Sequence, residues 1–99
     1  MARLDRDALL ASAIAALSAT ADPDGVSDLV ASKGHINVAA TPAEMGPAIK
    51  RLAQVGGYRW LVINGADLFA VSPLTIGTKV GILDQSGKVL KAADLPRPR

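Results

Sequence analysis

The chain has 99 residues, of which 49% are apolar and 3% aromatic, and its formal net charge is +2. It contains no cysteine, which excludes thiol catalysis, thiolate zinc sites and disulfide frameworks. The weak positive charge also differs from the clustered basic face of a dedicated nucleic-acid-binding domain. A chain of this length corresponds to one domain, residues 1–99, whose core must be mainly aliphatic and alanine-rich.

The N-terminal stretch lacks the features of a secretory leader, because Asp5 and Asp7 lie among its basic residues. No apolar segment approaches the roughly 20 residues that a membrane-spanning helix needs. We therefore expect no secretion through a signal peptide and no membrane partner, and a location in the cytoplasm or as part of a virion.

The first helix is expected within residues 1–21, starting at Asp5, because carboxylates in a first turn oppose the positive end of the helix dipole. Its apolar side chains recur at helical spacing, as Leu10, Ile14 and Leu17 do. The many alanines between them leave one flat face. That face suits packing on the chain's own sheet or on a neighbouring subunit.

A turn at Asp22-Pro23-Asp24-Gly25 follows, since each residue favours its turn position. Residues 26–33 fit either a short helix or a strand. Residues 35–40 alternate and predict a strand.

The next helix, over residues 42–55, has the strongest start signal in the chain. Thr41 can cap it, Pro42 suits the first helical position, and Glu44 completes a capping box. Pro47 lies inside this helix and predicts a kink there, or a second start.

Residues 58–72 contain the chain's single Tyr, Trp and Phe. Asn64-Gly65 between two apolar runs favours a hairpin, with strands over 58–64 and 67–72. Alternation along such strands puts all three aromatic side chains on one face, so we expect them to be buried together. They are Tyr58, Trp60 and Phe69.

A second hairpin is expected from residues 79–84 and 88–92, with Gly87 in the left-handed conformation of the turn. Residues 93–99 form an extended Pro/Arg tail. The predicted fold class is α+β. Two main helices pack on a mainly antiparallel sheet of four to five strands, built from two consecutive C-terminal hairpins.

Residue patterns typical of catalysis are absent or occur singly. His35 is the only histidine, no Gly-x-Ser-x-Gly elbow is present, and Asp28 and Glu44 do not lie at a recognised metal-ligand spacing from it. No glycine-rich phosphate-binding pattern occurs either. We expect no enzyme, no cofactor and no metal.

The sequence therefore favours a small non-enzymatic structural or assembly protein, a subunit of a homo-oligomer or a larger complex such as a viral particle. A short chain that is nearly half apolar has more hydrophobic surface than one small core hides, and such surface usually meets a partner. The expected partners are the chain itself or other protein subunits. The candidate partner-binding residues are Leu10, Ile14, Leu17, Arg97 and Arg99.

The alternative function is a small nucleic-acid-binding module. Its phosphate contacts would come from basic residues of the C-terminal hairpins, namely Arg59, Lys79, Lys88 and Lys91. Phosphate binding weakens steeply as salt releases counterions, whereas an apolar interface persists, so salt dependence separates the two functions.

Overall fold

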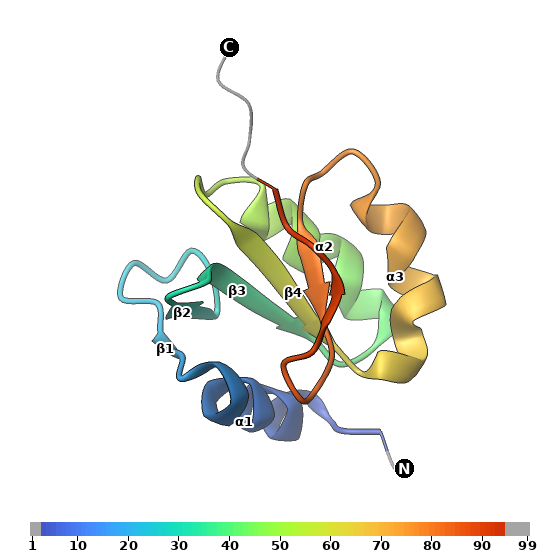
Figure 1. Cartoon of the computed structure of the whole chain (residues 1–99), viewed down its shortest axis with the longest axis horizontal. Coiled ribbons are helices and arrows are strands. Elements are labelled where there is room, and N and C mark those ends of the chain that lie inside the picture. The colour runs from blue at the N-terminus through green and yellow to red at the C-terminus, as the bar shows by residue number, and fades with distance from the viewer. Residues whose placement is uncertain (1–2, 95–99) are drawn as a thin grey trace.

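The computed structural model of the chain describes residues 3–94, which form a sheet with helices on both faces (Figure 1). Within these residues there are three α-helices and six strands. The helices are α1 (Arg6–Leu17), α2 (Pro42–Leu52) and α3 (Leu68–Thr75), and a 3₁₀ turn (Gly65–Asp67) precedes α3. The strands are β1 (Thr20–Ala21), β2 (Leu29–Ala31), β3 (Gly34–Ala39), β4 (Arg59–Ile63), β5 (Gly81–Leu83) and β6 (Val89–Lys91).

The six strands lie in the sheet in their chain order, and their directions are mixed. The central pairs β3–β4 and β4–β5 are parallel, whereas β1–β2, β2–β3 and β5–β6 are antiparallel. Parallel neighbours need a crossover connection, and α2 and α3 supply the two crossovers. The class α+β is retained, but the prediction of a mainly antiparallel sheet of four to five strands built from two hairpins is wrong.

The predicted hairpin over residues 58–72 is the source of the error. Asn64 is extended, with φ −68° and ψ 131°, and the chain then enters the 3₁₀ turn through an Asp67 N to Asn64 O hydrogen bond of 2.8 Å. Residues 67–72 are therefore not a strand but the end of the 3₁₀ turn and the start of α3. Its buried side chains, Val71 and Thr75, are four residues apart, as one face of a helix requires.

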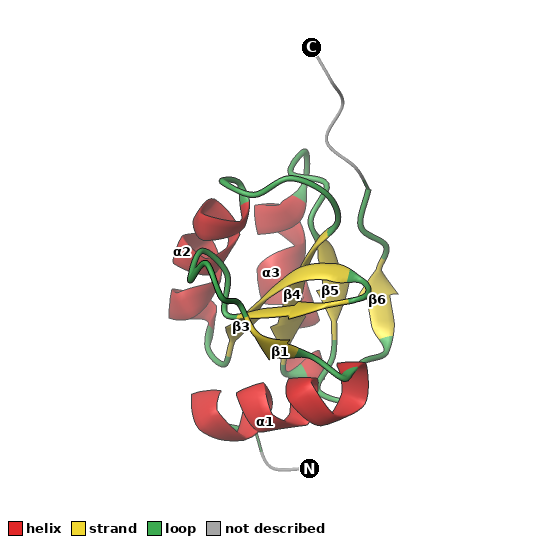
Figure 2. Cartoon of the chain, turned by 90° about the vertical axis from the view of Figure 1, so that its left-hand side faces the viewer, coloured by secondary structure: helices red, strands yellow, loops and turns green. Residues whose placement is uncertain are grey.

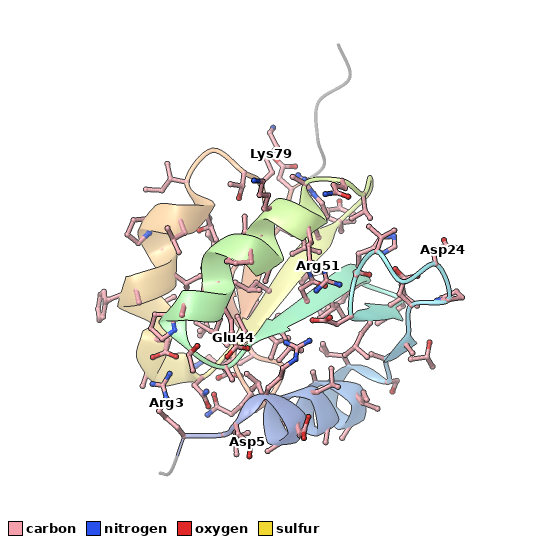
Figure 3. All side chains as sticks on the ribbon, turned by 180° about the vertical axis from the view of Figure 1, so that it is seen from behind. Arg3, Asp5, Asp24, Glu44, Arg51 and Lys79 are labelled. Atoms are coloured by element: carbon pink, nitrogen blue, oxygen red, sulfur yellow. The ribbon has the colours of Figure 1, made fainter. Side chains whose placement is uncertain are left out.

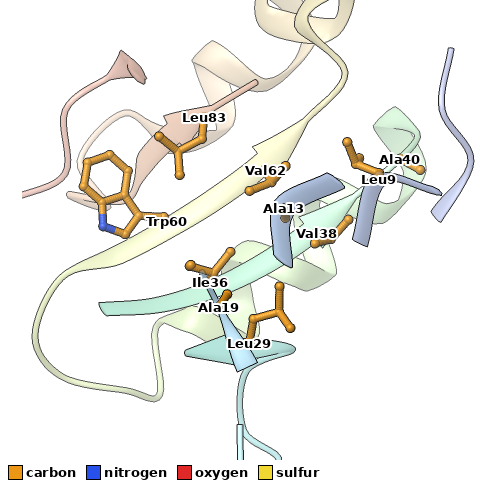
Figure 4. Packing of buried hydrophobic residues seen from close by; sticks show 10 residues of the cluster. All are labelled: Leu9, Ala13, Ala19, Leu29, Ile36, Val38, Ala40, Trp60, Val62 and Leu83. Atoms are coloured by element: carbon orange, nitrogen blue, oxygen red, sulfur yellow. The ribbon is translucent and has the colours of Figure 1, made fainter. Parts of the chain in front are cut away.

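Two apolar cores lie on the two faces of the sheet. The core beneath α1 is shown in Figure 4 and is made by Leu9, Ala13, Ala19, Leu29, Ile36, Val38, Ala40, Trp60, Val62 and Leu83. The core beneath α2 and α3 is made by Ala39, Met45, Ala48, Ile49, Leu52, Leu61, Ile63, Val71, Val80 and Ile82. Figure 2 shows the same layers from the side. Strand β4 is buried throughout, which is typical of a parallel strand covered on both faces.

Several local predictions are confirmed. The first helix is α1, which starts after its N-cap Asp5 but already ends at Leu17, where Ser18 takes φ 52°. Strand β3 lies where residues 35–40 predicted one, and residues 26–33 contain β2 rather than a helix. Antiparallel β5–β6 is the second hairpin, and Gly87 has φ 83° in its turn.

Helix α2 starts where it was predicted but ends at Leu52 rather than at residue 55, and its N-cap Thr41 makes no side-chain capping hydrogen bond. Pro42 lies in its first turn, and Thr41 Oγ1 donates to Glu44 Oε2 at 3.0 Å. The helix continues through Pro47 to Leu52 without a second start.

The expected burial of all three aromatic side chains is confirmed only for Trp60, which is 8% exposed. Tyr58 is 45% exposed and Phe69 is 90% exposed. Phe69 is exposed because its segment is helical, so it no longer shares a face with Trp60. This correction defines the main candidate surface of the molecule.

Candidate interaction surface

Helix α3 is apolar on the side that faces away from the sheet. Phe69, Pro73 and Ile76 are exposed and follow one another at i, i+4 and i+7, so they form one stripe along the helix. Ile76 is 75% exposed and directly follows the last helical residue. No charged residue occurs between Asp67 and Lys79. We call Phe69, Ala70, Pro73, Leu74 and Ile76 the α3 surface.

The C-terminal turn of α3 is fixed by two cationic side chains from the sheet. Lys91 Nζ donates to the carbonyl oxygen of Thr75 at 3.3 Å and to its hydroxyl at 3.0 Å. Arg59 donates from Nη2 to the carbonyl oxygen of Thr78 at 2.8 Å. Cations at a helix C-terminus interact favourably with its dipole. The α3 surface therefore lies on a helix whose C-terminal end is fixed by hydrogen bonds, and not on a loose loop.

The other end of α3 is fixed by the N-terminal segment of the chain. Both terminal nitrogens of Arg3 donate to the Asp67 carboxylate, with Nη1 at 2.7 Å from Oδ1. Arg3 Nη2 also donates to the carbonyl oxygen of Ala40, which follows β3, at 3.0 Å. Figure 3 shows Arg3 beside the beginning of α3. The carboxyl ends of β3 and β4 are thus covered by residues of the same chain.

A polar network lies where β3 extends beyond its pairing with β2. Asp28 accepts from the backbone N–H of Val38 at 2.9 Å and from Arg6 and Arg51 at 3.1 and 3.3 Å. Arg6 also donates to the Val38 carbonyl oxygen at 2.9 Å. These side chains replace the missing strand partner of Val38, as backbone groups at a buried edge require.

The same network borders a hollow of about 380 Å³ beside α2. Two of the residues that line this hollow, Glu44 and Arg51, belong to α2 and are labelled in Figure 3. Its two arginines face two carboxylates, since Glu44 lies 3.7 Å from Arg6 Nη1 and Asp28 contacts both guanidinium groups. The charges are balanced and their hydrogen bonds are made within the chain. We therefore infer that the role of this network is structural, namely to bond the backbone groups at the β3 edge.

Asp22, Ser27 and His35 are close together, but their geometry is not that of a catalytic triad. Ser27 Oγ lies 2.8 Å from His35 Nδ1 and donates to Asp22 Oδ2 at 2.9 Å, and the same Nδ1 is 3.6 Å from that carboxylate. In a triad the hydroxyl and the carboxylate contact opposite ring nitrogens. Ser27 is also buried. This cluster holds the loop between β1 and β2, and no sequence pattern indicated that His35 pairs with Asp22.

The predicted partner-binding residues of α1 are only partly available. Leu10 and Leu17 are half-buried against the core beneath α1, and Ile14 is 41% exposed. Arg97 and Arg99 lie outside the described residues, as does most of the expected tail.

The four basic residues of the nucleic-acid alternative do not form one surface. Arg59 and Lys91 reach the turn after α3, where Lys79 Nζ lies 4.0 Å from an Asp94 carboxylate oxygen. Lys88 is exposed in the β5–β6 turn, and its backbone N–H donates to Asp84. Arg59 is only 6% exposed, so it cannot contact a phosphate backbone in the way that the sequence predicted.

The residues of the α3 surface were not predicted as a site. The signal that could have found them is the uncharged run from Leu68 to Thr78, read at helical rather than strand spacing. A helix that is apolar all round is normally buried on all sides.

Comparisons with protein-family models, curated proteins and solved structures found no match to this chain. Within residues 3–94, no three His, Asp or Glu side chains are grouped so that they could hold a metal ion. None of the helices in that range is long and apolar enough to cross a membrane.

Proposed function

We propose that this protein is an assembly subunit that pairs with a second copy of itself through the α3 surface. The observation that carries the proposal is the 90% exposure of Phe69, the only phenylalanine of the chain. An exposed aromatic side chain within a contiguous apolar patch is typical of a protein–protein interface.

The inner face of α3 already packs on the core beneath α2 and α3, so the outer face can be buried only by another molecule. Both faces of this helix are apolar, and such a helix is normally surrounded by protein. Single apolar side chains scattered over a protein surface are normal and would not indicate a partner. Here Phe69, Pro73 and Ile76 follow one another along one helix face, with Leu74 beside them.

A second copy fits because the α3 surface is self-complementary. If two α3 helices pack antiparallel, Phe69 of each copy lies against Ile76 of the other, and Ser72 and Pro73 meet near the centre. An isologous interface has this reciprocity, and two-fold dimers are the commonest soluble oligomers. No charge lies between Asp67 and Lys79, so this pairing brings no like charges together.

The helix alone is too short for a complete interface. Its eight residues span about 12 Å, whereas a specific interface buries about 800 Å² on each partner. Helix α2 lies beside α3 on the same side of the sheet, as Figure 3 shows, and Pro42 and Gly46 are among its exposed residues. We therefore propose that part of α2 completes the interface.

The test is the solution mass of the parent and of two charge variants, Phe69→Asp and Ile76→Asp. Each substitution is at an exposed position, so the folded monomer should keep its stability within about 0.5 kcal/mol. We expect a dimeric parent at low salt and at about 0.5 M salt, where the Debye length is only a few ångströms. Both variants should be monomeric.

Ile14→Glu is the matched control, because Ile14 is a large apolar side chain of α1 that is 41% exposed. It should leave the dimer intact. A monomeric parent in both salts, or a dimer lost through Ile14→Glu but kept by Phe69→Asp, would contradict the proposal. Loss of mass on raising the salt alone would instead indicate association through charges.

A further inference from the structure

Arg59 is a buried cation that has no anionic partner among residues 3–94. The residue is 6% exposed, and no carboxylate in that range forms an ion pair with it. Its Nε is buried without a hydrogen-bond acceptor. The guanidinium group has five N–H donors, and the Thr78 carbonyl oxygen accepts from one of its terminal nitrogens.

A guanidinium cannot lose its charge at physiological pH, unlike a buried lysine or histidine. Buried charges in proteins are normally paired, because removing an ion from water is strongly unfavourable. A single hydrogen bond to a backbone carbonyl oxygen offsets only part of that desolvation penalty. A leucine or methionine at this strand position would fill the space without that penalty, so the hydrogen bond to Thr78 is the structural contribution that a charge at this position makes.

The surroundings of Arg59 add positive charge. The Lys91 ammonium donates to Thr75, three residues before the Thr78 acceptor of Arg59, and Lys79 directly follows that acceptor. Asp94, near Lys79, is the acidic residue at this turn in the described part of the chain. Three cationic side chains and one carboxylate thus belong to the residues around the turn after α3.

The two loops next to Arg59 are exposed at their glycines. These glycines are at positions 56, 57 and 77, and apart from their chain neighbours no heavy atom lies within 4 Å of where a Cβ would be at any of them. Tyr58, which is 45% exposed, gives this rim an apolar contact. Figure 3 shows this end of the molecule at the label of Lys79, opposite the end marked by Arg3.

We propose that Arg59 binds a carboxylate supplied from outside the chain. Guanidinium and carboxylate groups match in a planar, two-bonded geometry. The source is either an acidic side chain of a protein segment, held also by the apolar rim, or a free small carboxylic acid. The site does not depend on pairing through the α3 surface.

The test is a titration of the full chain with sodium acetate, followed at the Arg59 Nε–H by heteronuclear NMR. We expect a saturable shift of this resonance with acetate, and none with acetamide, its neutral analogue, or with sodium chloride at equal ionic strength. The melting temperature of the parent should rise by a few degrees with saturating acetate. Arg59→Met should show no acetate-dependent rise, and Arg59→Lys only a small one, because it keeps the charge but loses the planar donor pair.

A blocked Leu-Glu-Leu peptide and its Leu-Gln-Leu counterpart distinguish the two sources. At least tenfold tighter binding of the Glu peptide than of acetate would indicate a protein segment, and equal or weaker binding a free acid. The titrations are repeated on Phe69→Asp, so that a monomeric protein that still binds separates this site from the proposed dimer. The proposal is overturned if neither carboxylate shifts the resonance, or if only inorganic phosphate and a short oligothymidine do so.

Discussion

Asn64 binds the backbone of Leu4 at both polar groups. Its Oδ1 accepts from Leu4 N at 2.9 Å, and its Nδ2 donates to the Leu4 carbonyl oxygen at 3.0 Å. The side-chain amide thus makes the pair of backbone hydrogen bonds that a neighbouring strand would make. These bonds join the N-terminal segment to the end of β4. In open α/β sheets this carboxyl edge is the usual ligand site. Here the chain's own N-terminal segment covers it, which is why the candidate surfaces lie elsewhere.

Replacing Asn64 by alanine should destabilise the fold by about 2–3 kcal/mol, because buried groups that lose a partner keep their desolvation penalty. The groups affected are the two polar atoms of Leu4 and the Ala40 carbonyl oxygen, which accepts from Nδ2 at 3.2 Å. Urea unfolding of the parent and the variant measures the difference. Gln54→Ala is the control, since that amide is exposed and should change stability by no more than about 0.5 kcal/mol. Equal midpoints for Asn64→Ala and the parent would show that the N-terminal segment is not held in this way.

Gly34 and Gly46 should respond to alanine in opposite directions. Gly34 has φ 128°, and a Cβ there would lie 2.2 Å from the Tyr58 carbonyl oxygen. Gly34→Ala should therefore destabilise by at least about 2 kcal/mol, from backbone strain alone or with displacement of β4. Gly46 lies inside α2 with nothing within 4 Å of its Cβ position, so Gly46→Ala should stabilise by about 0.5–1 kcal/mol. Thermal unfolding of the pair measures both signs, and a stable Gly34→Ala would mean that β3 and β4 are not this close.

The elements that could be predicted from sequence are those set by neighbouring residues. Pro42 and Glu44 marked the start of α2, and Gly87 marked the β5–β6 turn, because each satisfies a local backbone requirement. Strand β3 followed from the alternation of its side chains. In each case, the residues that decide the conformation lie within a few positions of one another.

The segment after β4 could not be predicted in that way, because the contacts that fix it come from distant residues. Gly65 N donates to Gln85 Oε1 at 2.9 Å, and Asn64 is occupied by Leu4 rather than by a hairpin turn. Leu68 and Val71 are compatible with a strand or a helix in so short an apolar run. The misplacement of Phe69 followed from this one choice, and with it the α3 surface. Arg59 was recognised as basic, but its burial depends on the turn after α3.

The stability of the β1–β2 loop should depend on pH through Asp22. Backbone N–H groups of Ser27 and Asp24 donate to its carboxylate and, with the Ser27 hydroxyl and His35, outweigh burial and lower its pKa from 3.8 to about 2. The unfolded chain therefore takes up this proton at a higher pH than the folded chain. The contribution is complete above 3.8 and is lost as the pH falls toward 2.

Asp22→Asn should lower stability at neutral pH and flatten its decline between pH 4 and 2, measured by urea unfolding at several pH values. Asp24→Asn is the control, because it keeps the backbone N–H that donates to Asp22 at 2.9 Å. An acid limb with the same slope in Asp22→Asn and in the parent would show that other carboxylates account for the acid sensitivity.

Trp60 and Phe69 should differ in what their loss does to the folded chain. Trp60 lies in the core beneath α1, its Nε1 donates to the Lys33 carbonyl oxygen at 3.1 Å, and the Lys33 ammonium is 5.0 Å from the ring centre. Trp60→Ala should therefore destabilise by about 3–5 kcal/mol. Phe69→Ala, measured at a protein concentration below that of dimerisation, should change stability by no more than about 0.5 kcal/mol. Urea unfolding of both variants at that concentration tests the contrast. A large loss for Phe69→Ala would place its ring inside the monomer and remove the basis of the α3 surface.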